Sequence, residues 1–378
     1  MIFLNNQTET CKQTKIAHLF FPHLFAKSGI PFFKNNFQEW NFDCLIMSKP
    51  TDPEEYKHIQ GAKYYTVCNS KEERHFIKNT LKKYDYVFIH SLFLARSTKV
   101  FVGLFNPRLL KKIVWVTWGY DLYLSKDSGL KGQLSYWASL LTRFVFENKV
   151  SHFVGIHPVD LKSYNQIIGG CAALYCAPYR FNTNKEANQF LIDYKSFPIS
   201  EKMSKGEPFT IQIGHRAVSD LNHIRLLDKL SVYKDENIRI FLPLSYGDFK
   251  YARKVEDYAR SIFEGKVVVQ SSMVPIDEYR RMLSSVDILA IDCKRQIALG
   301  NIHTMFYMQK KVFLPHDSLL SEYYKENGVL VYDIENLGKM SFKELTSDDD
   351  LSAERKYIES FESKSSIELW EQVFKSLR

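Results

Sequence analysis

The sequence predicts an α/β protein of two doubly wound units in tandem, with a cleft between them. In the first half, short apolar runs alternate with stretches of helical periodicity, as in parallel strands joined by crossover helices. This alternation begins again at Phe209, after a polar stretch rich in Lys, Asn and Ser. Of the 378 residues, 45% are hydrophobic and 25% are charged, which is sufficient for two packed cores.

The first unit is placed at residues 1–185. Its helices are expected near residues 28–40, 71–83, 97–105 and 130–149. Its strand candidates are six apolar runs: Ile16–Phe21, Phe42–Met47, Tyr64–Val67, Tyr86–His90, Ile113–Thr117 and His152–Ile156. The polar stretch at residues 186–208 is interpreted as the linker between the two units.

The second unit is placed at residues 209–352. Its helices are expected near residues 220–233, 249–263, 276–284, 301–309 and 318–326. Its strand candidates are again six apolar runs: Phe209–Ile213, Ile238–Pro243, Val267–Gln270, Ile288–Ile291, Val312–Leu314 and Val329–Tyr332. Residues 353–378 are interpreted as a C-terminal helical segment, either one long helix or a broken pair.

Positive charge is concentrated in the first half of the chain. Residues 1–200 contain 25 Lys and Arg against 15 Asp and Glu, whereas residues 201–378 contain 26 against 28. A basic half is typical of proteins that meet nucleic acid, an anionic membrane surface or a phosphorylated substrate, and charge alone does not choose among them. The basic half carries no RRM, KH or helix-turn-helix signature, which argues against nucleic acid.

Several classes of protein are excluded by missing signals. No apolar run approaches the roughly 20 residues of a membrane-spanning helix. The first residues lack the features of a signal peptide, and we expect a cytoplasmic location. The motifs of P-loop nucleotidases, dinucleotide-binding folds, α/β-hydrolases and HExxH metalloproteases are also absent. The six cysteines form no metal-binding pairs, and Asp348–Asp350 is interpreted as a solvated helix start. We therefore expect no metal and no cofactor.

Polar and aromatic residues follow two candidate strands of the first unit, at the edge where open α/β sheets bind their ligands. His90 lies at the end of one strand and is either a catalytic base or a hydrogen-bonded structural residue. After another strand, Trp118, Gly119 and Tyr120 offer close approach and aromatic stacking to an acceptor sugar. Asp121 offers a carboxylate that takes a proton from a hydroxyl group, or alternatively caps the next helix.

In the second unit, two glycines mark candidate phosphate sites. Gly214 ends a strand and is followed by His215 and Arg216, and Gly300 with Asn301 opens a helix. Backbone N–H groups at a helix start, the helix dipole and a nearby cation bind a phosphate without a metal. The remaining candidates for this site come from the same unit: Asn222, His223, Ser245 and Tyr246.

The sequence resembles the TDP-Fuc4NAc:lipid II Fuc4NAc transferases, which are bacterial glycosyltransferases of family 56 with the GT-B fold. The similarity runs from residue 80 to the C-terminus. The motifs that carry it occur in the family's order: WGYDLY (Trp118–Tyr123), Gly214 with Asn222–His223, LPLSYGD (Leu242–Asp248), ALGNI (Ala298–Ile302) and KKVFL (Lys310–Leu314).

The resemblance implies two Rossmann-like domains facing a central cleft, with the acceptor held by the N-terminal domain and the nucleotide sugar by the C-terminal domain. It implies transfer of a 4-acetamido-4,6-dideoxyhexose from a TDP-sugar to a polyprenyl-pyrophosphate-linked saccharide, as in enterobacterial common antigen assembly. We then expect a peripheral location on the inner face of the bacterial plasma membrane, where the basic half would meet anionic lipid. The aromatic segment His18–Phe37 is either that membrane contact or a buried strand and helix.

Two departures from the family's pattern leave the donor sugar open. His215 and Arg216 follow Gly214 where the family usually has Asn and Ser, and Leu221 stands where a polar residue is common. One alternative is a GT-B enzyme that uses another nucleotide sugar for O-antigen or capsule synthesis. The other, from a different class, is a non-catalytic sugar- or nucleic-acid-binding protein, since a fold does not dictate activity.

Overall fold

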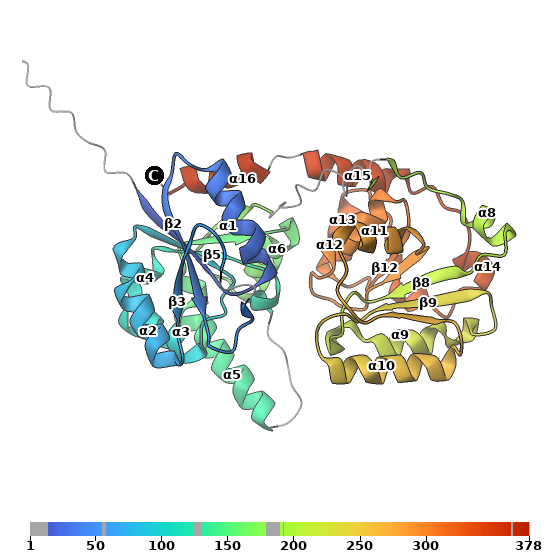
Figure 1. Ribbon diagram of the computed structural model, residues 1–378, viewed down its shortest axis with the longest axis horizontal. Helices are drawn as coiled ribbons and strands as arrows, with labels where there is room; N and C mark the ends of the chain where they lie inside the picture. The colour runs from blue at the N-terminus through green and yellow to red at the C-terminus, as the bar shows by residue number, and fades with distance from the viewer. Residues whose placement is uncertain are drawn as a thin grey trace, which may run out of the picture. The chain divides into compact units, whose positions relative to one another are not determined.

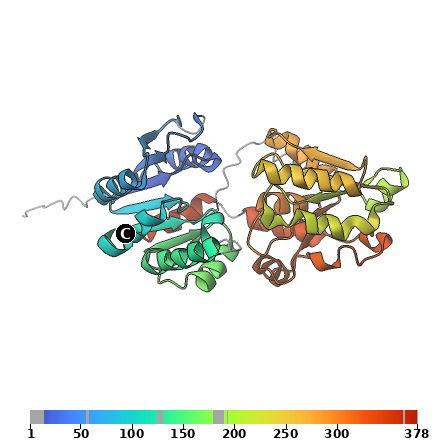
Figure 2. The same cartoon turned by 90° about the horizontal axis from the view of Figure 1, so that it is seen from below.

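The computed structural model describes residues 14–54, 58–123, 130–178, 190–191, 193–363 and 366–377. The chain divides into two compact units, unit 1 with Met1–Phe181 and Ser365–Arg378, and unit 2 with Asn182–Lys364. Each unit is built on one parallel sheet with helices on both faces (Figures 1 and 2). The predicted class, two doubly wound α/β units, is confirmed.

Unit 1 contains a seven-stranded parallel sheet in the order β3-β2-β1-β4-β5-β6-β7. Its strands are β1 (Lys15–Phe20), β2 (Asn41–Ser48), β3 (Ala62–Thr66), β4 (Tyr86–His90), β5 (Ile113–Val116), β6 (His152–Gly155) and β7 (Ala173–Cys176). Its helices are α1 (Leu24–Asn36), α2 (Ser70–Asn79), α3 (Arg96–Phe105), α4 (Pro107–Leu110), α5 (Leu130–Val145), α6 (Pro158–Ile167) and α16 (Ser366–Lys375). All six predicted strands are present. Three elements were not predicted: β7, α4 and α6. The strand β7 lies at the edge of the sheet, has four residues and has no fully buried side chain, so its apolar signal in the sequence is weak.

Alternate side chains of the central strands build two cores in unit 1. Leu19 and Ile89 face α2, α3 and α5, whereas Phe20 and Phe88 face α1 and α16. Along a strand, successive side chains point to opposite faces of the sheet. Continuous apolar runs in the sequence therefore correspond to strands that are buried on both faces.

Helix α16 returns the end of the chain to unit 1, where it packs beside α1 (Figure 1). Phe33 of α1 meets Trp370 of α16 with ring centroids 4.9 Å apart, and Phe37 meets Phe374 at 5.0 Å. Phe33 and Phe37 expose no surface, so the structure favours the buried interpretation of the segment His18–Phe37. Of the two arrangements expected after residue 353, the broken pair is found, and its first helix, α15 (Ser352–Ser363), belongs to unit 2.

Unit 2 contains a six-stranded parallel sheet in the order β10-β9-β8-β11-β12-β13. Its strands are β8 (Phe209–Ile213), β9 (Ile238–Pro243), β10 (Val267–Gln270), β11 (Ile288–Ala290), β12 (Lys311–Leu314) and β13 (Tyr332–Asp333). Its helices are α8 (Ile199–Ser204), α9 (His223–Leu230), α10 (Phe249–Ile262), α11 (Ile276–Ser284), α12 (Leu299–Tyr307), α13 (Leu319–Glu326), α14 (Phe342–Leu345) and α15. Five of the six predicted strands are present, and the sixth, Val329–Tyr332, overlaps β13 only at Tyr332. Helix α8 lies inside the stretch predicted as a linker.

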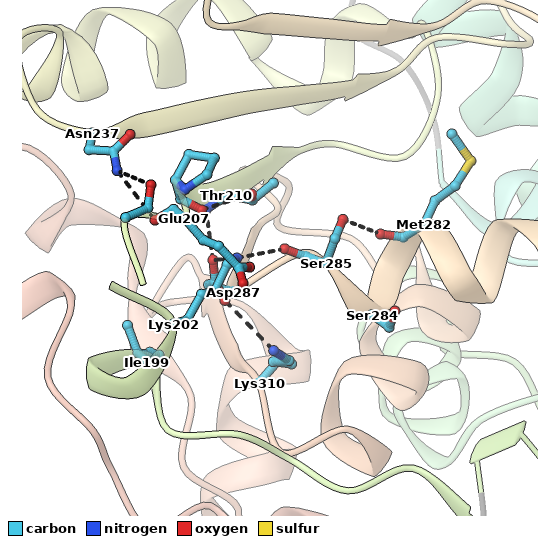
Figure 3. A network of polar contacts seen from close by, with 12 residues as sticks. Ile199, Lys202, Glu207, Thr210, Asn237, Met282, Ser284, Ser285, Asp287 and Lys310 are labelled. Carbon is cyan, nitrogen blue, oxygen red and sulfur yellow. Dashed lines mark hydrogen bonds and ion pairs between the residues drawn. The ribbon is translucent and has the colours of Figure 1, made fainter. Parts of the chain in front are cut away.

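A buried carboxylate fixes the amino edge of the sheet in unit 2 (Figure 3). Asp287 directly precedes β11, and its side chain is 1% exposed. It accepts hydrogen bonds from the backbone N–H of Thr210 at 2.7 Å and from Nζ of Lys202 at 2.5 Å, and Nζ of Lys310 lies 3.7 Å away. One carboxylate thereby ties α8, β8 and the start of β12 to β11. Because this network occupies the amino ends of the strands, the carboxyl ends carry the loops available for a ligand.

Two histidines form a buried pair between neighbouring strands of unit 1. Nδ1 of His18 on β1 lies 3.0 Å from Nε2 of His90 on β4, and both side chains are 0% exposed. The ring of His90 stacks on Phe20 at 3.9 Å, and that of His18 stacks on Phe88 at 4.6 Å. Burial lowers the pKa of His18 to about 3 and the pKa of His90 well below its ordinary value. Both rings are therefore neutral at physiological pH.

The neutral pair makes the stability of unit 1 sensitive to acid. The two pKa values lie below 6.5 in the folded chain, so unfolding takes up protons as the pH falls from 6.5 toward 3, and stability is lost over this range. Each proton taken up on unfolding makes the free energy of unfolding fall by about 1.4 kcal/mol for each pH unit.

Tryptophan fluorescence in urea measures the unfolding of unit 1, because all five tryptophans lie in this unit: Trp40, Trp115, Trp118, Trp137 and Trp370. In the double variant His18→Leu, His90→Leu, we expect the free energy of unfolding to depend less steeply on pH between pH 7 and 5. Replacement of the exposed His58 by Asn is the control, and an unchanged slope in the double variant contradicts the account.

Candidate active site

The candidate residues of unit 2 gather at the carboxyl edge of its sheet, on the loops that follow β8, β9 and β11. Gly214 turns the chain after β8 with φ +67°, which side-chain-bearing residues rarely adopt. A Cβ at this position would lie 2.4 Å from Nε2 of His223, so the loop rests directly on that ring. His223 is fully buried, and its Nδ1 lies 3.3 Å from the hydroxyl of Tyr251. His223, predicted as a ligand-binding residue, thus supports the loop from beneath.

The loops after β8 and β9 are joined by backbone hydrogen bonds. The N–H of Ala217 donates to the carbonyl of Tyr246 at 2.9 Å, and the N–H of Asp248 donates to the carbonyl of Ala217 at 2.8 Å. A Cβ on Gly247 would lie 2.2 Å from the oxygen of Ala217, so glycine is required where the loops touch. The carboxylate of Asp248 then caps α10 by accepting from the N–H of Lys250 at 2.8 Å. The LPLSYGD motif therefore contains the end of β9, the contact between the two loops and the cap of α10.

Asn222 connects the loop after β8 to the loop after β11. Its side-chain amide donates to the carbonyl of Asp292 at 3.1 Å, and its backbone is left-handed, with φ +47°. The guanidinium of Arg225, one turn into α9, pairs with the carboxylate of Asp292. Leu221, where the related proteins usually have a polar residue, is buried in the unit. The three loops are thus fastened to one another before any ligand binds.

Positive charge collects on these loops. Arg216 makes no ion pair with any residue that the structure describes, and its guanidinium carbon lies 6.0 Å from the ring centre of Tyr246. Arg295, by contrast, pairs with Asp220 at 3.0 Å. Burial lowers the pKa of His215 to about 3, with further contributions from the charges of Arg216 and Arg295. His215 is therefore neutral, and Arg216 is the cation left over for an anionic ligand.

The start of α12 lies on the same edge. Ala298 caps this helix in a left-handed conformation with φ +62°, and the first N–H groups of a helix have no carbonyl partner within it. A Cβ built on Gly300 would meet no atom within 4 Å, so this turn borders open space. The side-chain amide of Asn301 donates to the hydroxyl of Tyr279 at 2.8 Å. This helix start has the geometry of an anion site.

Tyr279 of α11 and Gln212 of β8 also belong to this edge, and neither was predicted as a site residue. Burial raises the pKa of Tyr279 to about 12, and nearby Tyr246 adds to the shift. The side-chain amide of Gln212 donates to the carbonyl of Gly214 at 2.8 Å. Tyr279 lies in an amphipathic helix and Gln212 in a buried strand. Both sequence patterns predict a core residue, so neither side chain is recognised as a site residue from the sequence. Ser245 is the remaining candidate, and its hydroxyl donates to Sδ of Met273 at 3.4 Å.

In unit 1, the carboxylate of Asp121 organises the loop after β5. One oxygen accepts from the N–H of Leu92 at 2.9 Å and from Nε1 of Trp115 at 2.6 Å. The other accepts from the hydroxyl of Thr117 at 2.8 Å and from the N–H of Trp118 at 3.0 Å. Four donors occupy the positions at which a base would accept a proton. The geometry favours a positioning role for Asp121 over the role of general base.

His90, the other candidate base, lies inside the core of unit 1. Its ring is fully buried against Phe20 and bonded to His18, as described above. A base must come within hydrogen-bonding reach of the proton that it removes. The structure therefore favours the structural alternative for His90.

Aromatic side chains surround the acceptor candidates of unit 1. The indole of Trp118 lies 4.9 Å from the ring of His23, 5.0 Å from Phe25 and 5.8 Å from Phe93. Its Nε1 is buried and has no hydrogen-bond partner among the residues that the structure describes. Gly119 is buried beside it, and Tyr120 is 61% exposed. The edge of this sheet thus presents stacking surfaces together with an unused N–H donor.

A second carboxyl group lies near Asp121 and was not predicted. Asp160 of α6 is fully buried, and one of its oxygens accepts from the N–H groups of Ile156 and His157, both at 3.0 Å. Burial raises the pKa of Asp160 to about 7, and the negative charge of Asp121 contributes. In the sequence this residue is hidden, because His157 and Asp160 form the capping box of α6.

The acidic triplet takes part in caps and an ion pair. Asp348 accepts from the N–H of Ile199 in α8, Asp349 pairs with Lys311 at 2.7 Å, and Asp350 caps α15. Within the described residues, no three His, Cys, Asp or Glu side chains are grouped as metal ligands. No helix in that part of the chain is both long enough and apolar enough to cross a bilayer.

The fold is that of the GT-B glycosyltransferases. The structure is similar to Anabaena Alr3699/HepE in complex with UDP-glucose, with TM-score 0.62 and 16% identity over 97% of this chain and 99% of that chain. It is also similar to a glycosyltransferase from Rickettsia africae ESF-5, with TM-score 0.59 and 13% identity over 97% and 99%. A third similar structure is an α,α-trehalose-phosphate synthase (UDP-forming) from Burkholderia xenovorans, with TM-score 0.62 and 8% identity over 96% and 99%.

Sequence similarity then identifies the family. The model of 4-alpha-L-fucosyltransferase, glycosyl transferase group 56, matches residues 74–376. The chain belongs to this family, as its motifs indicated, and it is a glycosyltransferase that acts with a nucleotide sugar. No curated protein matches the sequence.

The contact between Gly214 and His223 provides a test of the site in unit 2. In Gly214→Ala, the new methyl group meets His223 and the backbone is held in a left-handed conformation, which together displace the loop that bears Arg216. We expect calorimetry to show weaker binding of a nucleoside diphosphate. The control is Gly265→Ala, where φ is +72° but a Cβ would meet no atom within 4 Å. Gly265→Ala is expected to cost only the left-handed backbone strain, about 1–2 kcal/mol of stability, and to leave nucleotide binding unchanged. Equal nucleotide affinity in both variants contradicts the assignment of this loop.

Substitution of Asp121 separates a positioning residue from a base. In Asp121→Asn, the new side-chain N–H group faces hydrogen-bond donors and cannot accept from them, so the loop after β5 shifts. We expect turnover to fall about 100-fold, as for a small misplacement of a reacting group, with donor affinity retained because the donor candidates lie in unit 2. Thr117→Val, which removes one donor to Asp121, is expected to lower turnover in the same direction. A loss of the acidic limb of the pH–rate profile only in Asp121→Asn would make Asp121 the base instead.

Proposed function

We propose that the protein transfers a 4-acetamido-4,6-dideoxyhexose from a TDP-sugar to a polyprenyl-pyrophosphate-linked saccharide in bacterial surface polysaccharide assembly. The family and the motifs quoted above support this class of donor and acceptor. The donor site is proposed from one observation at the carboxyl edge of unit 2. Arg216 has no carboxylate partner among the described residues, and its loop is hydrogen-bonded to the loop that leads into α12. Tyr246 lies beside Arg216 on this edge, and the hydroxyl of Tyr279 accepts from the amide of Asn301 at that helix start.

The diphosphate of the donor is assigned to the start of α12 and Arg216. During transfer, the bond between the sugar C1 and the phosphate oxygen breaks, and the diphosphate departs with the electron pair. An acceptor hydroxyl oxygen forms the new bond to C1, and its proton passes to water. Helix N–H groups and a guanidinium that are already in position stabilise the charge developing on the phosphate without reorganising. Ser245, Tyr246, His215 and Asn301 are assigned to the walls of the same site.

The acceptor is assigned to unit 1. Trp118 offers a stacking face and a free indole N–H, Tyr120 is exposed beside it, and Gly119 allows close approach of the sugar. Asp121 is assigned to holding this loop rather than to proton transfer. The basic first half is consistent with a pyrophosphate-linked acceptor.

A second donor class has an observation in its favour. His215 and Arg216 stand where the related transferases usually have Asn and Ser, and this changes the side chains beside the donor. A GT-B enzyme for O-antigen or capsule synthesis with another nucleotide sugar is therefore the competing proposal. The Anabaena structure described above contains UDP-glucose.

Calorimetric titration distinguishes these donors and tests Arg216. TDP is expected to bind more tightly than UDP, GDP or CMP without added metal. Arg216→Ala is expected to weaken TDP binding about tenfold to hundredfold, because hydrogen bonds to a charged group contribute about 1.5–3 kcal/mol. Arg239→Ala, an exposed arginine on β9 of the same unit, is the matched control. Tighter binding of another nucleotide supports the second class, and equal affinity in both variants removes Arg216 from the site.

A further inference from the structure

The strongest unassigned feature is an apolar stripe on the solvent side of α5. Leu134, Trp137, Leu141 and Phe144 are 64%, 67%, 54% and 66% exposed. Their spacing of three, four and three residues places them on one face of the helix, over about 15 Å of its length. The side of α5 turned away from the stripe packs on the unit, where Thr142 and Arg143 are buried. Apolar side chains thus cover a face that a surface helix normally gives to polar residues.

The neighbouring helix adds two exposed apolar side chains. α5 lies beside α3 (Figure 1), which ends with Leu104 and Phe105, 56% and 70% exposed. The ring of Phe105 lies 5.3 Å from that of Phe101. Leu104, Phe105 and the four residues of α5 are together called the α3–α5 patch. Exposed apolar side chains gathered on two adjacent helices are typical of an interaction site.

Basic side chains border the α3–α5 patch. Nζ of Lys149 lies 5.6 Å from the ring centre of Phe144, and the guanidinium of Arg96 donates to the hydroxyl of Ser135 on α5 at 3.1 Å. The guanidinium of Arg74, on the adjacent α2, lies 5.8 Å from the ring centre of Phe101. From Arg96 to Lys149 the sequence has nine Lys and Arg against three Asp and Glu. The charge around the patch is therefore positive.

Two of the three acidic residues of this segment are held in contacts within the unit. Glu147 is buried, with Lys99 at 2.9 Å and Arg143 at 3.5 Å. Asp121 accepts the four hydrogen bonds described above, and Asp127 lies outside the described residues. A patch that combines leucine, tryptophan and phenylalanine with a basic border matches the boundary between acyl chains and anionic headgroups.

We propose that the α3–α5 patch docks unit 1 on an anionic lipid bilayer. The apolar stripe enters the headgroup region with α5 parallel to the surface, and Arg74, Arg96 and Lys149 face the lipid phosphates. This surface replaces His18–Phe37 as the membrane contact, because four phenylalanines of that segment, Phe20, Phe21, Phe33 and Phe37, are buried. The inference deepens the proposed function, since a lipid-linked acceptor lies in a membrane, but it stands on the exposure and charge of unit 1 alone.

Sedimentation of the full chain with vesicles tests the docking. Vesicles of phosphatidylcholine with one-third phosphatidylglycerol are expected to bind the protein, and pure phosphatidylcholine vesicles at least tenfold less. The triple variant Trp137→Ser, Leu141→Ser, Phe144→Ser is expected to bind at least tenfold more weakly than the parent. The matched control is Phe197→Ser with Val232→Ser, because these unit 2 residues are 64% and 62% exposed. High salt is expected to weaken binding of the parent.

Brominated lipids give a second measurement that does not depend on a multiple variant. The fluorescence of Trp137 is expected to be quenched on binding, and Trp137→Phe is expected to remove that quenching. Equal vesicle binding by the triple variant and the control pair overturns the proposal. A second result also overturns it: the parent does not bind vesicles but forms a dimer, and the triple variant does not form that dimer. That result would assign the patch to contact with a second copy of the chain. TDP titration of the triple variant keeps the two proposals apart, since lost docking leaves nucleotide affinity intact.

Discussion

The proposed donor site depends on the contact between a glycine and a buried histidine ring. Because Gly214 has no side chain, the chain turns sharply after β8 and rests on His223, two residues before Arg216. The backbone bonds between Ala217, Tyr246 and Asp248 then hold the loop after β9 against it. The amide of Asn222 adds the loop after β11. Charge-stabilising groups of this kind act best when they are fixed before the substrate arrives.

The two units use the same architecture for different chemistry. At the edge of unit 2, backbone N–H groups and a cation predominate, which suits a diphosphate. At the edge of unit 1, Trp118 and its aromatic neighbours predominate, held by a carboxylate that accepts four hydrogen bonds. The carboxylate of Asp287 plays a comparable role at the opposite edge of unit 2, so the site is left to the carboxyl ends. Assignment of the donor to one unit and the acceptor to the other is consistent with this division.

The fold was predictable in nearly all its strands, because parallel strands buried on both faces leave continuous apolar runs in the sequence. β7 was missed because its side chains are only partly buried. The motif residues of unit 2 were found through their glycines, which mark turns and helix starts. Pairing across strands was not predictable: nothing near His90 in the sequence indicates His18, and Asp121 gives no sign of its four donors. Nor does the aromatic segment His18–Phe37 reveal from its sequence which way it faces, and the structure places Phe33 and Phe37 in the core.

The carboxyl edge of unit 2 is proposed to bind the donor diphosphate. Hydrogen–deuterium exchange of the full chain with and without TDP tests this assignment, because it maps protection along the backbone. We expect slower exchange at residues 214–217, 244–248 and 298–302, with no change at residues 199–210 and 284–287 on the opposite edge. Protection at the opposite edge, or in unit 1 alone, would contradict it.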